Sequence, residues 1–197
     1  MGRKNPLASI RVSEKNEPLI SRNNVVTSLN IDNLPNLNIT SREKNSTITI
    51  QTLKEPASIV LDFDKKVDYL KLSNRERKGK IYLPWLHIHH RLMPNDAYTL
   101  LRIFVKFASE STLNSHINTS FSWLSSYLVT NKVALSDFSV KHFNFIAEEK
   151  SSSVVRGTLI YNLGTLKTII SYVPNIPKSI KERINSYKPA SSVFNNS

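Results

Sequence analysis

Three histidines in the segment HIHHR, residues 87–91, are the first candidates for chemistry in this chain. His87 and His89 alternate, so they would share one face of a strand, and imidazole nitrogen is a common zinc ligand. His90 would be the third ligand, but no Cys, Asp or Glu lies close by to complete a coordination shell. A histidine-rich strand end on a basic surface is therefore favoured over a metal site, and we predict no metal and no cofactor.

Two tyrosines, Tyr161 and Tyr172, could be taken for nucleophiles, because a phenolic oxygen can attack a phosphodiester. Neither has a cluster of His or Arg residues near it in the sequence, and Tyr172 lies in an apolar stripe that favours packing. In FSWLSSY, the three aromatic residues Phe121, Trp123 and Tyr127 lie at helical spacing, which favours core packing over base stacking. The sequence predicts no catalytic residue and no small-molecule substrate.

The net charge of the chain indicates the class of its partner. Lys and Arg number 27 against 15 Asp and Glu, giving +12 and a pI near 9.9. Residues 1–93 hold 16 basic and 9 acidic residues, net +7, and residues 94–197 hold 11 and 6, net +5. Such an excess favours an anionic partner, most often nucleic acid and less often an acidic membrane surface. The basic turn NRERKGK at 74–80 lacks the spacing of a P-loop, although its cations could contact phosphates.

Several features bear on the compartment. The chain has no cysteine, which excludes disulfides and thiolate metal sites. No apolar run approaches the roughly 20 residues of a membrane span, and the beginning, MGRKNPLASIRV, lacks the hydrophobic core of a signal peptide. We therefore expect a soluble, cytoplasmic protein without a membrane partner.

The two halves of the 197-residue chain differ in their sequence pattern. Residues 1–45 show weak periodicity and indicate an arm or irregular segment. Residues 46–93 hold short alternations of apolar residues, in STITIQTL, SIVLDFD and KIYLPWL, and period two indicates half-buried strands. We therefore predict a small β-containing region at 46–93, a helical domain at 94–187 and a tail at 188–197.

Apolar residues recur at helical spacing in five segments of the second half. The predicted helices are 96–109, 119–130, one capped by Ser139, 151–173 and 178–187. Three serines open the segment 151–173, Pro174 ends it, and its apolar stripe runs from Val155 to Val173. The predicted fold class is mainly α, a compact bundle of four to five helices preceded by an irregular, β-containing N-terminal region.

Three phrases of the helical half carry a resemblance. NTSFSWLSSYLVTNKVAL, SDFSVKHFNFIAEE and TLIYNLGTLKTIISYV follow one another, and the last contains Leu, two small residues, Leu, a basic residue and an apolar pair. Those positions are Leu163, Gly164, Thr165, Leu166, Lys167, Ile169 and Ile170. In this order the run from Asn118 to Val173 resembles the core-binding (SAM-like) domain of tyrosine recombinases, the phage-integrase family.

The resemblance implies a function in DNA integration and recombination. The partner would be duplex DNA, with self-association on the DNA, in a bacterial or phage-encoded protein that associates with the nucleoid when bound. The chemistry of this family needs a Tyr nucleophile, two Arg, a Lys and His residues, in a domain that follows the core-binding domain. HIHHR does not supply the family's His and Arg spacing, because Arg91 stands four residues after His87. We therefore expect a non-catalytic DNA-binding portion that clamps one side of the duplex.

The predicted DNA contacts lie mainly on the polar face of the segment 151–173. Cations, hydroxyls and amides are donors that the DNA backbone and base edges accept, and three serines at a helix start would leave N–H groups for a phosphate. The predicted phosphate contacts are Arg156, Lys167, Lys141 and Lys132. Thr158 is a further predicted donor, and Tyr161 and Asn162 are predicted groove contacts.

Two other functions stay open at this point. One is a stand-alone regulatory DNA-binding protein, and the other is a protein-interaction bundle whose basic charge is incidental. A competing account of DNA contact assigns it to the basic arm, through Arg3, Lys4, Arg11 and Arg22.

Overall fold

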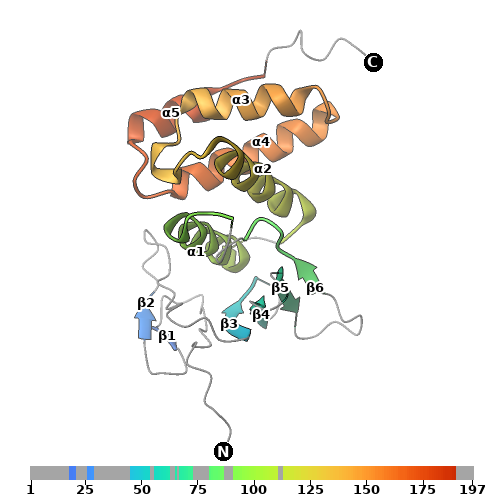
Figure 1. The fold of residues 1–197 in the computed structure, drawn as a ribbon, viewed down its shortest axis with the longest axis vertical. Coiled ribbons are helices and arrows are strands. Elements are labelled where there is room, and N and C mark those ends of the chain that lie inside the picture. The colour runs from blue at the N-terminus through green and yellow to red at the C-terminus, as the bar shows by residue number, and fades with distance from the viewer. Residues whose placement is uncertain are drawn as a thin grey trace, which may run out of the picture. The chain divides into compact units, whose positions relative to one another are not determined.

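The computed structural model describes residues 18–20, 26–28, 45–53, 56–62, 65, 67–72, 80–86, 91–110 and 113–189 (Figure 1). The chain divides into two compact units, Met1–Leu113 and Asn114–Ser197. Within the described residues there are five α-helices and a four-stranded antiparallel sheet in the N-terminal region, so the mainly-α class is confirmed. No described helix is both long enough and apolar enough to cross a bilayer.

The sheet of the first unit consists of β3 (Asn45–Gln51), β4 (Pro56–Asp62), β5 (Val67–Leu72) and β6 (Lys80–Tyr82), paired in that order. The predicted alternation is confirmed for β3 and β4, because Ile48, Ile50, Ile59 and Leu61 are all buried. Ile81 on β6 is half-buried, and Phe63 lies outside the described residues. The register places Ile59 opposite both Ile48 on β3 and Leu70 on β5. A separate ribbon of β1 (Pro18–Ile20) and β2 (Val26–Ser28) lies in the segment that was predicted to be irregular.

Helix α1 (Pro94–Glu110) belongs to the first unit, which differs from the predicted boundary at residue 94. It packs on the sheet, where Leu53 N–H donates to the carbonyl of Ala108 at 2.9 Å and the Trp85 ring lies 5.1 Å from that of Phe104 (Figure 1). Most of the helix surface is buried, from Ile103 through Ala108. The apolar face of a sheet must pack against another element. The residues near α1 in the sequence did not indicate that the sheet is the packing partner of this helix.

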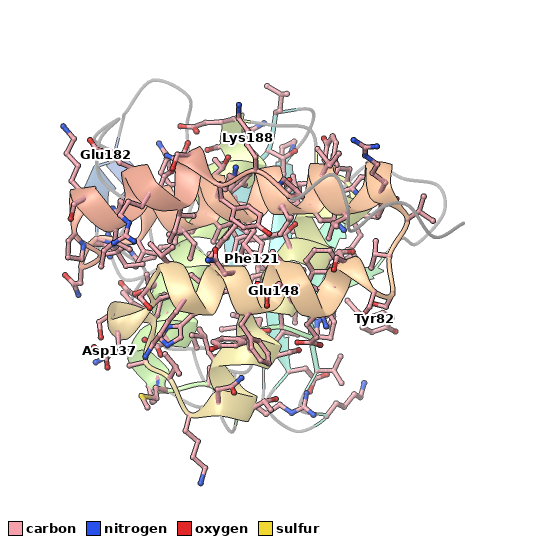
Figure 2. The ribbon with its side chains drawn as sticks, turned by 90° about the horizontal axis from the view of Figure 1, so that it is seen from above. Tyr82, Phe121, Asp137, Glu148, Glu182 and Lys188 are labelled. Carbon is pink, nitrogen blue, oxygen red and sulfur yellow. The ribbon has the colours of Figure 1, made fainter. Side chains whose placement is uncertain are left out.

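The second unit contains α2 (Ser115–Asn131), α3 (Val140–Ser151), α4 (Arg156–Tyr172) and α5 (Lys178–Ser186), with a short 3-10 helix at Leu135–Asp137. Helix α2 packs against α4, and α3 and α5 pack on each other and on α4. Phe121 is fully buried between these helices, whereas Asp137 and Glu182 lie at the periphery (Figure 2).

The helix ends show which sequence signals were interpreted correctly. Ser139 precedes α3 as predicted, and its N–H donates to Nδ1 of His142 at 3.2 Å. Helix α2 begins four residues earlier than predicted, because the Oδ1 atom of Asn114 accepts the N–H of Ile117 at 3.1 Å.

The three serines do not begin α4, which corrects the prediction. Their hydroxyls donate to the carbonyls of Glu148, Glu149 and Lys150, at 2.7, 2.8 and 3.4 Å, so they complete the C-terminal end of α3. Val155, which was predicted to face inward, directly precedes α4 and is 79% exposed.

Candidate nucleic-acid interface

Helix α4 has one buried side and one exposed side. Leu159, Leu163, Leu166 and Ile170 are buried at helical spacing, as predicted. The exposed positions begin at its N-terminal end and are Arg156, Gly157, Thr158, Ile160, Tyr161, Gly164 and Thr168. The helix contains neither Asp nor Glu, whereas α3 carries Glu148 and Glu149 and α5 carries Glu182. The exposed side of α4 therefore carries polar groups and no carboxylate of the helix itself, with Ile160 as an apolar neighbour.

Tyr161 is held in place by the beginning of α2. Its side chain is 51% exposed, and its hydroxyl accepts a hydrogen bond from Nδ2 of Asn114 at 3.3 Å. Its ring lies 4.4 Å from the ring of His116. Neither partner of Tyr161 was predicted from the sequence. Asn114 could have been found from its position as a cap before Ile117, but His116 has no sequence signal.

Asn162 does not face solvent, which corrects its assignment as a groove contact. It is 1% exposed, its Oδ1 lies 2.8 Å from Nδ1 of His116, and its backbone carbonyl accepts from Oγ of Ser120 at 3.0 Å. Its burial follows from the helical repeat, because it lies three residues after the buried Leu159 and therefore on the same side of the helix. The polar character of its side chain misled the prediction, since this amide joins α4 to α2.

Lys167 is engaged within the unit and does not present its ammonium as predicted. Nζ donates to the carbonyls of Asn185 and Tyr187 at the end of α5, at 3.1 and 2.6 Å. In return, Nζ of Lys181 on α5 donates to the carbonyl of Ser171 at the end of α4, at 2.9 Å. Burial lowers the pKa of both lysines. We call these contacts the reciprocal lysine caps, since each ammonium satisfies carbonyls at the C-terminal end of the other helix.

We expect Lys167→Met to destabilise the helical unit by about 1–2 kcal/mol, because it keeps the apolar stem but leaves two helix-end carbonyls without their charged donor. Urea unfolding followed by far-ultraviolet circular dichroism measures this loss. Lys178→Met is the matched control, because that lysine is exposed on α5 and lies 3.8 Å from Glu182. Equal stability losses in the two variants would contradict a capping role for Lys167.

The other predicted cations lie in two separate places. Lys132 is the left-handed cap of α2, with φ 53° and ψ 39°, and Lys141 lies in the first turn of α3; both are exposed. Arg156 and Thr158 lie at the beginning of α4, beyond the other end of α3. The length of α3, about 18 Å for its 12 residues, separates the two places. The structure therefore brings Arg156, Thr158 and Tyr161 together, and Lys132 and Lys141 lie apart from them.

The histidine segment falls largely outside the described residues, as do the turn 74–79 and the arm 1–17. Within the described ranges, no group of three or more His, Cys, Asp or Glu side chains is placed to hold a metal ion. The chain matches no protein-family model, no curated protein and no solved structure.

Proposed function

We propose that this chain binds duplex DNA through the N-terminal half of α4, as the non-catalytic DNA-binding portion of a site-specific tyrosine recombinase. The observation that carries the proposal is the exposed side of α4, which presents Arg156, Thr158 and Tyr161 on a helix without a carboxylate. The resemblance of residues 118–173 to a core-binding domain supports the recombinase context, and the net charge of +12 supports a polyanionic partner.

The beginning of α4 also offers backbone donors. Val155 precedes the helix without a side-chain hydrogen bond to the first turn. The N–H groups of a first turn have no partner within the helix, and the helix dipole favours an anion at this end. The first turn of α4, and not the three serines, is therefore the source of backbone N–H groups. Arg156 adds a full positive charge beside these N–H groups.

Two glycines allow a close approach to the exposed side of α4. A Cβ atom built on Gly157 or Gly164 would meet nothing within 4 Å, so the chain's own packing does not require either glycine. Glycine within a helix costs about 1 kcal/mol relative to alanine. Because glycine has no side chain, these two positions would let the sugar-phosphate backbone come close to the polar groups of the helix. This is consistent with DNA as the partner.

We expect the full chain to bind duplex DNA with a Kd of about 10⁻⁴ to 10⁻⁶ M at physiological salt, the range of non-specific contacts. Arg156→Gln should weaken binding to unrelated sequences alike and reduce the salt slope by about one, because one phosphate contact is lost. Fluorescence anisotropy with labelled duplexes, titrated across a series of salt concentrations, measures both quantities.

Arg183→Gln is the matched control, because it makes the same charge change at an exposed position of α5. An equal loss in both variants would show that overall charge, not α4, determines binding. A third full-length variant with Arg3, Lys4 and Arg11 changed to Gln tests the arm. If that variant abolishes binding and Arg156→Gln does not change it, the arm is the DNA-binding element.

A protein-interaction bundle is the second candidate, and one observation favours it. Val155, just before α4, and Ile160 on α4 are exposed, and Phe145 is 51% exposed on α3. Exposed apolar side chains can mark protein contacts where they form a patch. Sedimentation of the full chain with and without duplex DNA separates the candidates, since a protein contact predicts association that does not need DNA and survives high salt.

A further inference from the structure

The four-stranded sheet has a second face, opposite the one that α1 covers. Side chains alternate along a strand, so the residues next to the buried Ile59, Leu61 and Leu70 point to the other side of the sheet. We call this second side the open face. The register aligns Val60 on β4, Tyr69 on β5 and Tyr82 on β6 in one row across the sheet.

Two tyrosines form an aromatic pair in that row. The rings of Tyr69 and Tyr82 lie 6.5 Å apart, centroid to centroid, at an interplanar angle of 66°. Tyr82 is 58% exposed, although a large aromatic side chain in a sheet is normally packed. The pair therefore places aromatic surface next to solvent on a rigid element.

The charges of this sheet suit an anion. Asp62 and Asp68 are only 7% and 2% exposed, and Oδ1 of Asp62 accepts the N–H of Lys65 at 3.1 Å. The Lys65 side chain is 77% exposed, and Lys71 is exposed on the same face as Tyr69, two residues further along β5. Among the described residues of β4, β5 and their hairpin, the exposed charges are therefore positive.

Aromatic rings beside lysine on an open antiparallel sheet match the chemistry of unpaired nucleotides. Each base has a flat face that stacks on an aromatic side chain, and each phosphate pairs with a cation. A duplex cannot use such a surface, because its base faces are already stacked within the helix. We propose that the open face of the β3–β6 sheet binds single-stranded nucleic acid, with Tyr82 and Tyr69 stacking on bases and Lys71 contacting phosphate.

This site does not depend on the proposed role of α4, because it lies in the other unit and takes unpaired strands. The test uses the full chain and labelled homopolymers of about 20 nucleotides, oligo-dT and oligo-rU, which form no duplex. Tyr82→Ala is expected to weaken binding of the homopolymers about 5- to 100-fold, the range for losing one stacked base. Tyr82→Phe should stay within about twofold of the parent, since phenylalanine keeps the ring.

Phe145→Ala is the matched control, because it removes a similarly exposed aromatic side chain from α3 in the second unit. It should leave homopolymer binding unchanged, and Tyr82→Ala should leave duplex binding unchanged. Fluorescence of Trp85, which is buried in the first unit, checks that the Tyr82 variants fold when it is read in the Trp123→Phe background.

Homopolymer binding that is absent at low salt, or that Tyr82→Ala does not weaken, would overturn the proposal. An equal loss on duplex and homopolymer would also overturn it, since stacking on unpaired bases would not explain the loss. A difference between oligo-dT and oligo-rU, with the effect of Tyr82→Ala retained, supports the site and identifies which nucleic acid it prefers. Failure of Arg156→Gln to weaken duplex binding would overturn only the role of α4.

Discussion

Asp68→Asn is expected to stabilise the first unit at about pH 8 and to remove most of its pH dependence between about pH 4 and 7. Asp68 is 2% exposed, and within the described part of the chain neither of its carboxyl oxygens has a hydrogen-bond partner. Burial raises its pKa to about 7 from the usual 3.8. The negative charge of Asp62 adds to this rise.

The sign of the effect follows from proton binding. Between about pH 4 and 7 the folded state keeps the proton of Asp68, whereas the unfolded state has lost it, so stability falls as pH rises. The two pKa values differ by about three pH units, and each unit corresponds to about 1.36 kcal/mol. The burial of this carboxyl therefore destabilises the unit by up to about 4 kcal/mol above pH 7. Asparagine has nearly the same shape and stays neutral at every pH.

The measurement needs a signal from the first unit alone. The chain has two tryptophans, Trp85 in the first unit and Trp123 in the second, so Trp123→Phe leaves Trp85 as the only reporter. A whole-chain signal would mix opposite effects, because burial and the charge of Lys141 lower the pKa of His142 in the second unit. Because of this histidine, the second unit loses stability as the pH falls below 6.5, the usual pKa of its imidazole.

Urea unfolding of the Trp123→Phe chain, with and without Asp68→Asn, is compared across this pH range. Glu110→Gln is the control, because it removes a carboxylate charge at an exposed position of α1 in the same unit. A pH slope that persists in the Asp68→Asn variant would show that another group causes it.

Asn162→Ala is expected to destabilise the helical unit by about 1–3 kcal/mol, because it removes a buried hydrogen bond and leaves the partner atom of His116 without its acceptor. The His116 ring would also lose the restraint that keeps it against Tyr161. Circular dichroism during urea unfolding measures the change, since four of the five described α-helices belong to this unit.

A double-mutant cycle with His116→Ala assigns the effect of Asn162. If Asn162 and His116 stabilise the fold through their shared hydrogen bond, the double variant should lose less stability than the two single losses added together. Asn175→Ala, in the exposed turn before α5, is the control for removing an asparagine side chain. Strict additivity of the two substitutions would contradict a direct bond between Asn162 and His116.

Local patterns predicted the helices and the strands β3, β4 and β6, but not β1, β2 or β5. The alternation around Ile59 indicated β4, the helical spacing of Leu159 to Ile170 indicated α4, and Ser139 indicated the beginning of α3. These signals depend only on how a segment buries one face or caps one end, so neighbouring residues in the chain are enough to recognise them.

The failed assignments of Lys167 and Asn162 depend on contacts between segments far apart in the sequence. Lys167 has its carbonyl partners 18 and 20 residues away, and Asn162 meets His116 46 residues away. A polar side chain on a helix is predicted to face solvent unless the position of its partner is known. The aromatic pair of Tyr69 and Tyr82 depends in the same way on the pairing of β5 with β6.

The reciprocal lysine caps have a consequence for folding during synthesis. Helix α4 leaves the ribosome before α5, and its last carbonyls then lack Lys181, while Lys167 has no carbonyl to bind. Two further contacts of α5 are also missing at that stage, the fully buried Ile184 and the ring of Tyr187, which lies 5.3 Å from that of Phe143. The helical unit therefore reaches full stability only after Tyr187 has emerged.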